Sequence, residues 1–169
     1  MKRALAFLAF AAIIFFNSCS VQDKMNPLIF IEKFSEISGD SIKIDTPFYA
    51  ENKCVFFFTD ENNNEYVCEL LTDKANNIKK ICLVNDNVNK AESFINFSEI
   101  IINIFSPDDK SSLILSELFK NKFDYTDSQW YSYSSVISEK GMFFSTESKK
   151  LLTESDAELT LKQNDIIYH

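Results

Sequence analysis

The chain has 169 residues, with 25 Asp and Glu against 17 Lys and Arg, so its net charge at pH 7 is −8. Arg3 is the only arginine, and removal of Lys2 and Arg3 with a leader would bring the net charge to −10. Proteins that bind nucleic acids need clustered cations for phosphates and bidentate arginines for guanine edges, so we expect no nucleic-acid partner. Roughly 150 residues beyond the leader predict one domain.

Residues 1–18 have the layout of an export signal. Lys2 and Arg3 form a basic start, thirteen apolar residues follow from Ala4 to Phe16, and Asn17-Ser18 is a small polar exit. A membrane-spanning helix needs ~20 apolar residues, and polar residues begin directly after this run. We therefore expect the signal to be removed.

The segment Phe16-Asn17-Ser18-Cys19 resembles the lipobox of bacterial lipoproteins, in the relaxed form found in spirochaetes. Typical boxes have Leu where this chain has Phe16. The resemblance implies that Cys19 receives diacylglycerol and becomes the new N-terminus, with residues 19–26 as a tether to a domain over 27–169. Ser20 follows the cysteine, which by the enteric sorting rule favours the outer membrane over the inner. The alternative is an ordinary secretory signal cut near Ser18 or Ser20.

The first half of the domain predicts one helix followed by strands. Asn26-Pro27 is a cap with proline at the first helical position, apolar residues recur at helical spacing, and Gly39 closes the segment, so a helix is expected over 27–38. Apolar or alternating runs at 53–59, 65–71 and 78–84 are separated by the turn-rich clusters 60–64 and 72–77. They predict an antiparallel meander, with a further strand near 42–49.

The second half predicts two helices and then strands. Polar residues occupy one narrow stripe of 91–105, which predicts a largely buried helix. Ser106 is expected to cap a second helix, whose inner face would consist of Leu113, Ile114, Leu118 and Phe119. Alternation at 129–137, 142–147 and 157–163 predicts three more strands, with Lys140-Gly141 in a turn. The fold class is therefore α+β, with helices packed on antiparallel sheet in two helix-plus-meander units.

Cys54, Cys68 and Cys82 are spaced by fourteen, and each lies in a predicted strand. Hairpins centred near Asn62 and Ala75 would put all three on the core face, with Cys68 opposite Cys82. Two interpretations stay open: three buried thiols acting as small hydrophobes, or a Cys68–Cys82 disulfide in an oxidising periplasm.

The residue inventory gives little support for catalysis, a metal or a cofactor. The only histidine is His169, so no Ser-His-acid or Cys-His set is expected, and two glycines are too few for a phosphate-binding loop. No C-x-x-C pair occurs, which argues against structural zinc. The acidic cluster that begins at Asp60 lacks the glycine of a calcium loop and is interpreted as a turn. We expect no cofactor and no metal.

An aromatic segment, Trp130, Tyr131 and Tyr133, lies among serines and is a candidate recognition surface. Alternation puts Trp130 on the face opposite the two tyrosines. We expect Trp130 to face the core and Tyr131 and Tyr133 to be available for contact, because tyrosine hydroxyls tolerate water. The alternative is that these rings only pack against the core.

Two functional hypotheses remain. The first is a non-catalytic lipoprotein of the cell envelope that binds a protein, a glycan or a small ligand, with the membrane as a second partner through its N-terminal lipid. The second is a cell-envelope hydrolase that uses a pair of carboxylates.

The first prediction is that membrane-extracted protein has a lipid-modified N-terminus at Cys19, measurable by mass spectrometry. We also expect fractionation to place the protein with the outer membrane. A soluble, unmodified product would end the lipoprotein hypothesis, and co-fractionation with the inner membrane would reject the sorting assignment.

Overall fold

The computed structural model describes residues 25–121 and 123–149, which form helices and strands in the order expected for an α+β chain. The lipidation residue Cys19, the signal at 1–18 and the strand expected at 157–163 lie outside the described residues. The helices are α2 (Pro27–Ser38), α3 (Ala91–Phe105) and α4 (Ser111–Leu118), with the 3-10 turns η1 (Gly39–Ser41) and η2 (Val88–Lys90). The strands are β1 (Ile42–Ile44), β2 (Phe48–Ala50), β3 (Lys53–Asp60), β4 (Glu65–Thr72), β5 (Ile78–Asn85), β6 (Phe123–Asp127), β7 (Tyr131–Ser138) and β8 (Gly141–Ser148).

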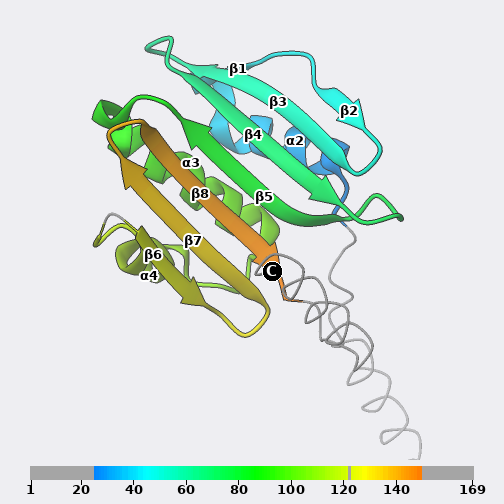
Figure 1. Cartoon of the computed structure of the whole chain (residues 1–169). Helices are drawn as coiled ribbons and strands as arrows, with labels where there is room; N and C mark the ends of the chain where they lie inside the picture. The colour runs from blue at the N-terminus through cyan, green and yellow to red at the C-terminus, as the bar shows by residue number, and fades with distance from the viewer. Residues whose placement is uncertain (1–24, 122, 150–169) are drawn as a thin grey trace, which may run out of the picture.

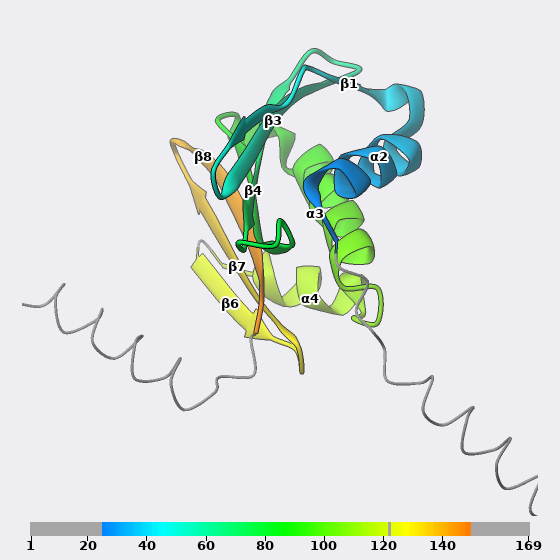
Figure 2. The same cartoon turned by 90° about the vertical axis from the view of Figure 1, so that its right-hand side faces the viewer.

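All eight strands belong to one antiparallel sheet in the order β1-β3-β4-β5-β8-β7-β6, with β2 also paired to β3 (Figure 1). The helices lie on one face of this sheet (Figure 2). The predicted α+β class is confirmed. The two expected meanders are not separate, because β5 pairs with β8 and joins them edge to edge.

Helix α2 has the bounds that the capping pattern predicts. The Ile29 amide donates to Asn26 Oδ1 at 3.0 Å, and Pro27 occupies the first turn, where no amide donor is needed. Gly39 ends the helix with φ +58°, a conformation that glycine adopts without steric cost.

An aromatic cluster fills the core between the helices and β3. Phe58 has no more than 1% of its surface exposed, and its ring centroid lies 5.1 Å from that of Phe34 on α2 and 5.0 Å from that of Phe97 on α3. Both contacts are edge-on, which is a favoured arrangement for ring pairs. Tyr66 stacks on Phe58 at 4.9 Å from the neighbouring strand. This cluster therefore ties both longer helices to the same face of the sheet.

The turn between β3 and β4 is organised by Asp60. One carboxylate oxygen accepts from the amides of Asn62 and Asn64, both at 2.9 Å, and the Asn64 side chain donates to the same carboxylate. Asn63 adopts the left-handed conformation, φ +57°, which asparagine tolerates better than most residues. The acidic cluster is thus a hairpin turn, as the sequence predicted.

The β4–β5 turn repeats this arrangement around Asp73. Its carboxylate accepts from the amides of Ala75 and Asn77 at 2.9 Å, and Asn76 takes the left-handed position with φ +62°. The shared pattern Asp-x-x-Asn-Asn therefore gives two equivalent turns.

A bulge in β5 overturns the predicted placement of the cysteines. Thr72 pairs with Ile78, as a hairpin centred on Ala75 requires, but Leu71 pairs with Lys80, so Lys79 is an extra residue. One extra residue moves every later side chain of a strand to the other face. Cys82 consequently lies opposite Glu69 rather than Cys68.

The predicted shared face and the opposed Cys68–Cys82 pair are therefore wrong. Cys54 and Cys68 are buried on the helix side, Cys82 is half-buried on the other side, and all three thiols are free. The same shift puts Val84 on the face away from the helices, where it is 40% exposed.

Helix α4 also differs from its prediction. Ser106 ends α3 instead of capping α4, because its hydroxyl donates back to the Ile102 carbonyl. The buried residues of α4 are Leu115 and Leu118, whereas Leu113 is 58% exposed.

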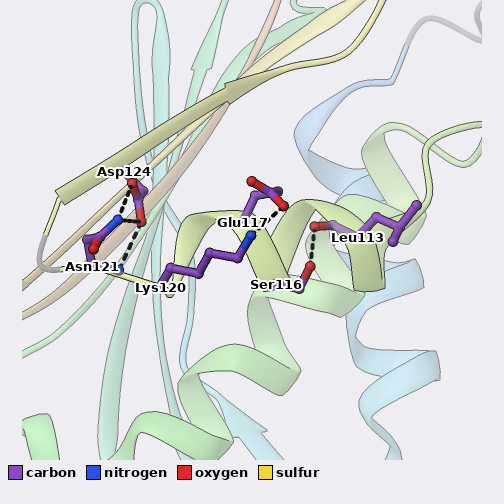
Figure 3. Close-up of polar contacts among 6 residues, drawn as sticks. All are labelled: Leu113, Ser116, Glu117, Lys120, Asn121 and Asp124. Atoms are coloured by element: carbon purple, nitrogen blue, oxygen red, sulfur yellow. Dashed lines mark hydrogen bonds and ion pairs between the residues drawn. The ribbon is translucent and has the colours of Figure 1, made fainter.

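The residues after α4 form a local polar link to β6. Lys120 pairs with Glu117, and the Asn121 side chain donates to the Asp124 carboxylate (Figure 3). Strand β6 follows and pairs with β7, at the sheet edge where the sequence had predicted no strand. Within the described residues, no helix is long and apolar enough to cross a membrane.

Replacement of Asp60 by Asn tests the turn. Burial alone would raise the pKa of Asp60, but hydrogen bonds from Asn64, Asn62 and Tyr66 outweigh it and lower the pKa. A carboxyl group with a lowered folded pKa stabilises the fold above its unfolded pKa of ~3.9, and this contribution is lost as pH falls through the folded pKa. We expect Asp60→Asn to lower the unfolding free energy by ~1–3 kcal/mol at pH 7. The new side-chain NH₂ group would face the NH₂ group of Asn64, so one hydrogen bond from Asn64 would lose its acceptor.

Urea denaturation at pH 7 and pH 2 measures this difference, which should shrink in acid. Glu36→Gln, at an exposed position of α2, is the control and should match the wild type. An equal loss of stability at both pH values would show that the ionised form of Asp60 is not what stabilises the turn.

Candidate functional site

The aromatic segment at 130–133 has the opposite orientation to the one predicted. Tyr131 and Tyr133 are 4% and 1% exposed, whereas Trp130 is 46% exposed. Strand β7 starts at Tyr131, and its alternation directs Tyr131, Tyr133 and Ser135 toward the helices. The two tyrosines are therefore core residues, and their assignment as contact residues is wrong.

Tyr133 anchors the connection between α3 and α4. Its hydroxyl donates to the Asp109 carboxylate and lies 2.7 Å from the Ser106 hydroxyl. Burial, together with the hydrogen bond to Asp109, raises the pKa of Tyr133 well above its ordinary value. Burial also raises the pKa of Tyr131 to about 12, with Asp109 and Asp108 contributing. Both hydroxyls are thus held neutral, which suits a structural hydrogen bond rather than proton transfer near pH 7.

A concave site lies elsewhere, between α2 and the edge of the sheet. It is a groove of about 750 Å³, within the range of ligand pockets, and it is open to solvent. Figure 2 shows α2 beside the β1 end of the sheet. The lining residues are Leu28, Ile31, Glu32 and Ser35 from α2, and Ile44, Asp45, Thr46, Pro47 and Tyr49 from the edge.

The groove exists because the edge strand is interrupted. Ile44 pairs with Phe58 and Phe48 pairs with Val55, so three edge residues, 45–47, span two residues of β3. Pro47 has no amide hydrogen and cannot continue the ladder. The edge therefore leaves its register at this point and provides one wall of the groove.

The second wall comes from apolar residues of α2 at the border of the core. Phe30 and Phe34 face the sheet and are fully buried, whereas Leu28 is 67% exposed and Ile31 is half-buried. Tyr49 also lines the groove, and it is the cross-strand partner of Cys54 in the pairing of β2 with β3. Burial and this neighbour raise the pKa of Tyr49, so the ring is a neutral wall.

Two carboxylates supply the charge of the groove. Among the described residues that line it, only Glu32 and Asp45 are charged, and both are exposed. Among residues 25–121 and 123–149, neither lies within ion-pair distance of a lysine. The groove thus combines an apolar surface with negative charge, which favours ligands that have an apolar body and a cationic group.

In the described part of the chain, no three His, Cys, Asp or Glu side chains lie close enough together to hold a metal ion. Cys54 and Cys68 are poor ligands and nucleophiles, because both are buried and burial raises the pKa of their thiols.

Sequence reasoning missed the groove, although two signals were present. Helix 27–38 has more apolar positions than a single buried stripe needs, and Leu28 and Ile31 are part of that surplus. The interruption at Pro47 was the second signal. Neither shows that the two segments face each other, because their contact depends on the tertiary fold.

Comparison with protein-family models, with curated protein sequences and with solved structures found no match to this chain.

The unfolding free energies of single variants at positions 130 and 133 should show that Trp130 is a surface residue and Tyr133 a core residue. We expect Trp130→Ala to change the unfolding free energy by ~0.5 kcal/mol or less. Tyr133→Ala should cost ~3–5 kcal/mol because it empties a buried ring position. Tyr133→Phe, which removes only the hydroxyl, should cost ~1–3 kcal/mol. Chemical denaturation gives all three values, and a Trp130→Ala cost equal to that of Tyr133→Ala would contradict this assignment.

Proposed function

We propose that this protein is a non-catalytic lipoprotein of a bacterial cell envelope, and that the groove between α2 and the β1–β2 edge is its ligand-binding site. The ligand class is an apolar molecule with a positive charge, such as a hydrophobic peptide segment that contains lysine. One observation supports the proposal above all: the groove has apolar walls, and the charged groups that the described residues contribute to it are two carboxylates, Glu32 and Asp45.

The shape and size of the groove support a small or extended ligand rather than a large partner surface. Its volume of about 750 Å³ fits a drug-sized molecule or a few side chains of a peptide. Leu28 and Tyr49, both at least half exposed, offer apolar area that a ligand would remove from water. The carboxylates would then select the charge and orientation of that ligand.

The proposed location rests on the N-terminal sequence, where Cys19 ends a segment that resembles a lipobox. A diacylglycerol anchor has two acyl chains, and stable membrane attachment needs more than one. The anchor would hold the domain near the membrane, and residues 19–24 would separate the lipid from the first described residue, Met25.

The hydrolase hypothesis maps onto the same two carboxylates, since Glu32 and Asp45 both line the groove. We favour binding because both are exposed, whereas a carboxylic acid that serves as general acid usually sits in a pocket that excludes water. Turnover of a glycan or peptide that disappears in the Glu32→Gln/Asp45→Asn variant would establish hydrolysis instead.

The binding test uses the exported chain, residues 19–169 with Cys19→Ser so that it stays in solution. The probes are decylammonium and decanoate, which share an apolar chain and differ in charge. We expect calorimetric titration to detect decylammonium binding and weaker or no decanoate binding. Glu32→Gln/Asp45→Asn should weaken decylammonium binding at least ~10-fold, the loss of ~1.4 kcal/mol of interaction.

Two control variants make the result specific. Glu36→Gln changes a carboxylate on the same helix outside the groove and should leave the affinity unchanged. Leu28→Ser should weaken both probes, because it removes apolar surface rather than charge. Equal binding of the two probes, or an affinity unaffected by the double substitution, would contradict the proposed site.

A further inference from the structure

The face of the sheet that points away from the helices is uncovered by any described helix (Figure 2). An unbroken row of apolar residues crosses its five central strands. Each member is the direct cross-strand partner of the next, and we call the row the apolar ladder: Phe57 on β3, Val67 on β4, Val84 on β5, Phe143 on β8 and Val136 on β7.

The apolar ladder is open to solvent at the positions that matter most for contact. Phe57 is 49% exposed and Val84 is 40% exposed, although similar side chains on the other face are fully buried. Val84 is on this face because of the extra residue Lys79 in β5. The bulge therefore completes the ladder at its central position.

The charges around the apolar ladder cancel on the face itself. Lys53 pairs with Glu69 at 2.5 Å, Lys80 pairs with Glu147 at 3.3 Å, and Lys149 pairs with Asp127 at 2.9 Å. The whole chain has a net charge of −8, so its excess of acidic groups lies elsewhere. An acidic partner would be repelled by most of this molecule but not by this face.

We propose that this outer face is the interface between two copies of the chain. A two-fold axis parallel to the strands through Val84 would place Val84 against Val84 of the second copy. The order of residues along the ladder then sets Phe57 against Val136 and Val67 against Phe143. Each of these pairs matches a large side chain with a small one, which suits two sheets packed ~10 Å apart.

The size of the face fits a stable dimer. Seven strands lie abreast, and all five that the ladder crosses, β3, β4, β5, β7 and β8, have eight residues. At ~4.8 Å between strands and ~3.3 Å per residue, these five strands cover a flat area of roughly 650 Å². The uneven surface of the side chains adds to the area that a partner can bury. A standard interface buries ~800 Å² per partner. The ligand groove lies on the helix side, so this inference does not depend on the proposed ligand.

Sedimentation equilibrium of the exported chain, residues 19–169 with Cys19→Ser, tests the proposal. We expect a monomer–dimer equilibrium in which Val84→Glu raises the dissociation constant at least ~10-fold, since it places two carboxylates against each other at the axis. Leu113→Ser is the matched control: it removes an exposed apolar side chain from α4 on the other side of the molecule (Figure 3) and should leave the dissociation constant unchanged.

Chemical cross-linking is a second, independent test of the proposed dimer. Cys82 lies two residues from Val84 on the same face, so the proposed axis brings the two Cys82 thiols of a dimer close together. A short bis-maleimide should cross-link the Cys19→Ser chain but not the Cys19→Ser/Cys82→Ser chain, because Cys54 and Cys68 are buried.

Three results would overturn the proposal: a chain that stays monomeric at all concentrations, a dimer that Val84→Glu leaves intact, or cross-linking that survives Cys82→Ser. A monomer in which Val84→Glu lowers the melting temperature would show that the face is covered from within the chain.

Discussion

The packing of Phe58 against Phe34 and Phe97 is the contact on which the rest of the arrangement depends. It holds α2 and α3 against β3 from the same side. Because both helices are fixed there, the opposite face of the sheet has no helical cover among the described residues. The same contact sets the rotation of α2 about its own axis. With Phe30 and Phe34 turned to the sheet, Leu28 and Ile31 must point toward the edge, where the groove forms.

Local sequence signals predicted the elements well wherever the structure is decided by neighbours along the chain. Asn26-Pro27 and Gly39 fixed the ends of α2, and the two Asp-x-x-Asn-Asn turns fixed the ends of β3, β4 and β5. Helix α3 kept its predicted bounds because its narrow polar stripe leaves only one way to bury it. These features depend on capping, turn chemistry and periodicity, all of which can be read from a single sequence.

The wrong predictions arose where the placement of one residue decides which face of the sheet all later residues of its strand occupy. Lys79 is the extra residue of β5, and nothing in its chemistry marks a bulge, so Cys82 was placed on the wrong side. The start of β7 raised the same difficulty. Alternation correctly separated Trp130 from Tyr131 and Tyr133, but it does not say which set faces the helices, and the greater size of Trp130 misled the choice. The buried Tyr133 hydroxyl is accommodated because Asp109, from the connection between α3 and α4, accepts a hydrogen bond from it.

The pairing of β5 with β8 also constrains the order in which the molecule can be assembled. Helices α3 and α4 and strands β6 and β7 all lie between these partners in the chain, so the pairing has high sequence separation. Gly141 sits where β8 meets the end of β5, and a β-carbon there would come within 2.5 Å of the Asn85 carbonyl oxygen. A chain that emerges N-terminus first must therefore expose the edge of β5 until its last described strand arrives. Contacts of such long range slow folding and make it cooperative, so the first five strands are not expected to persist as a separate folding unit.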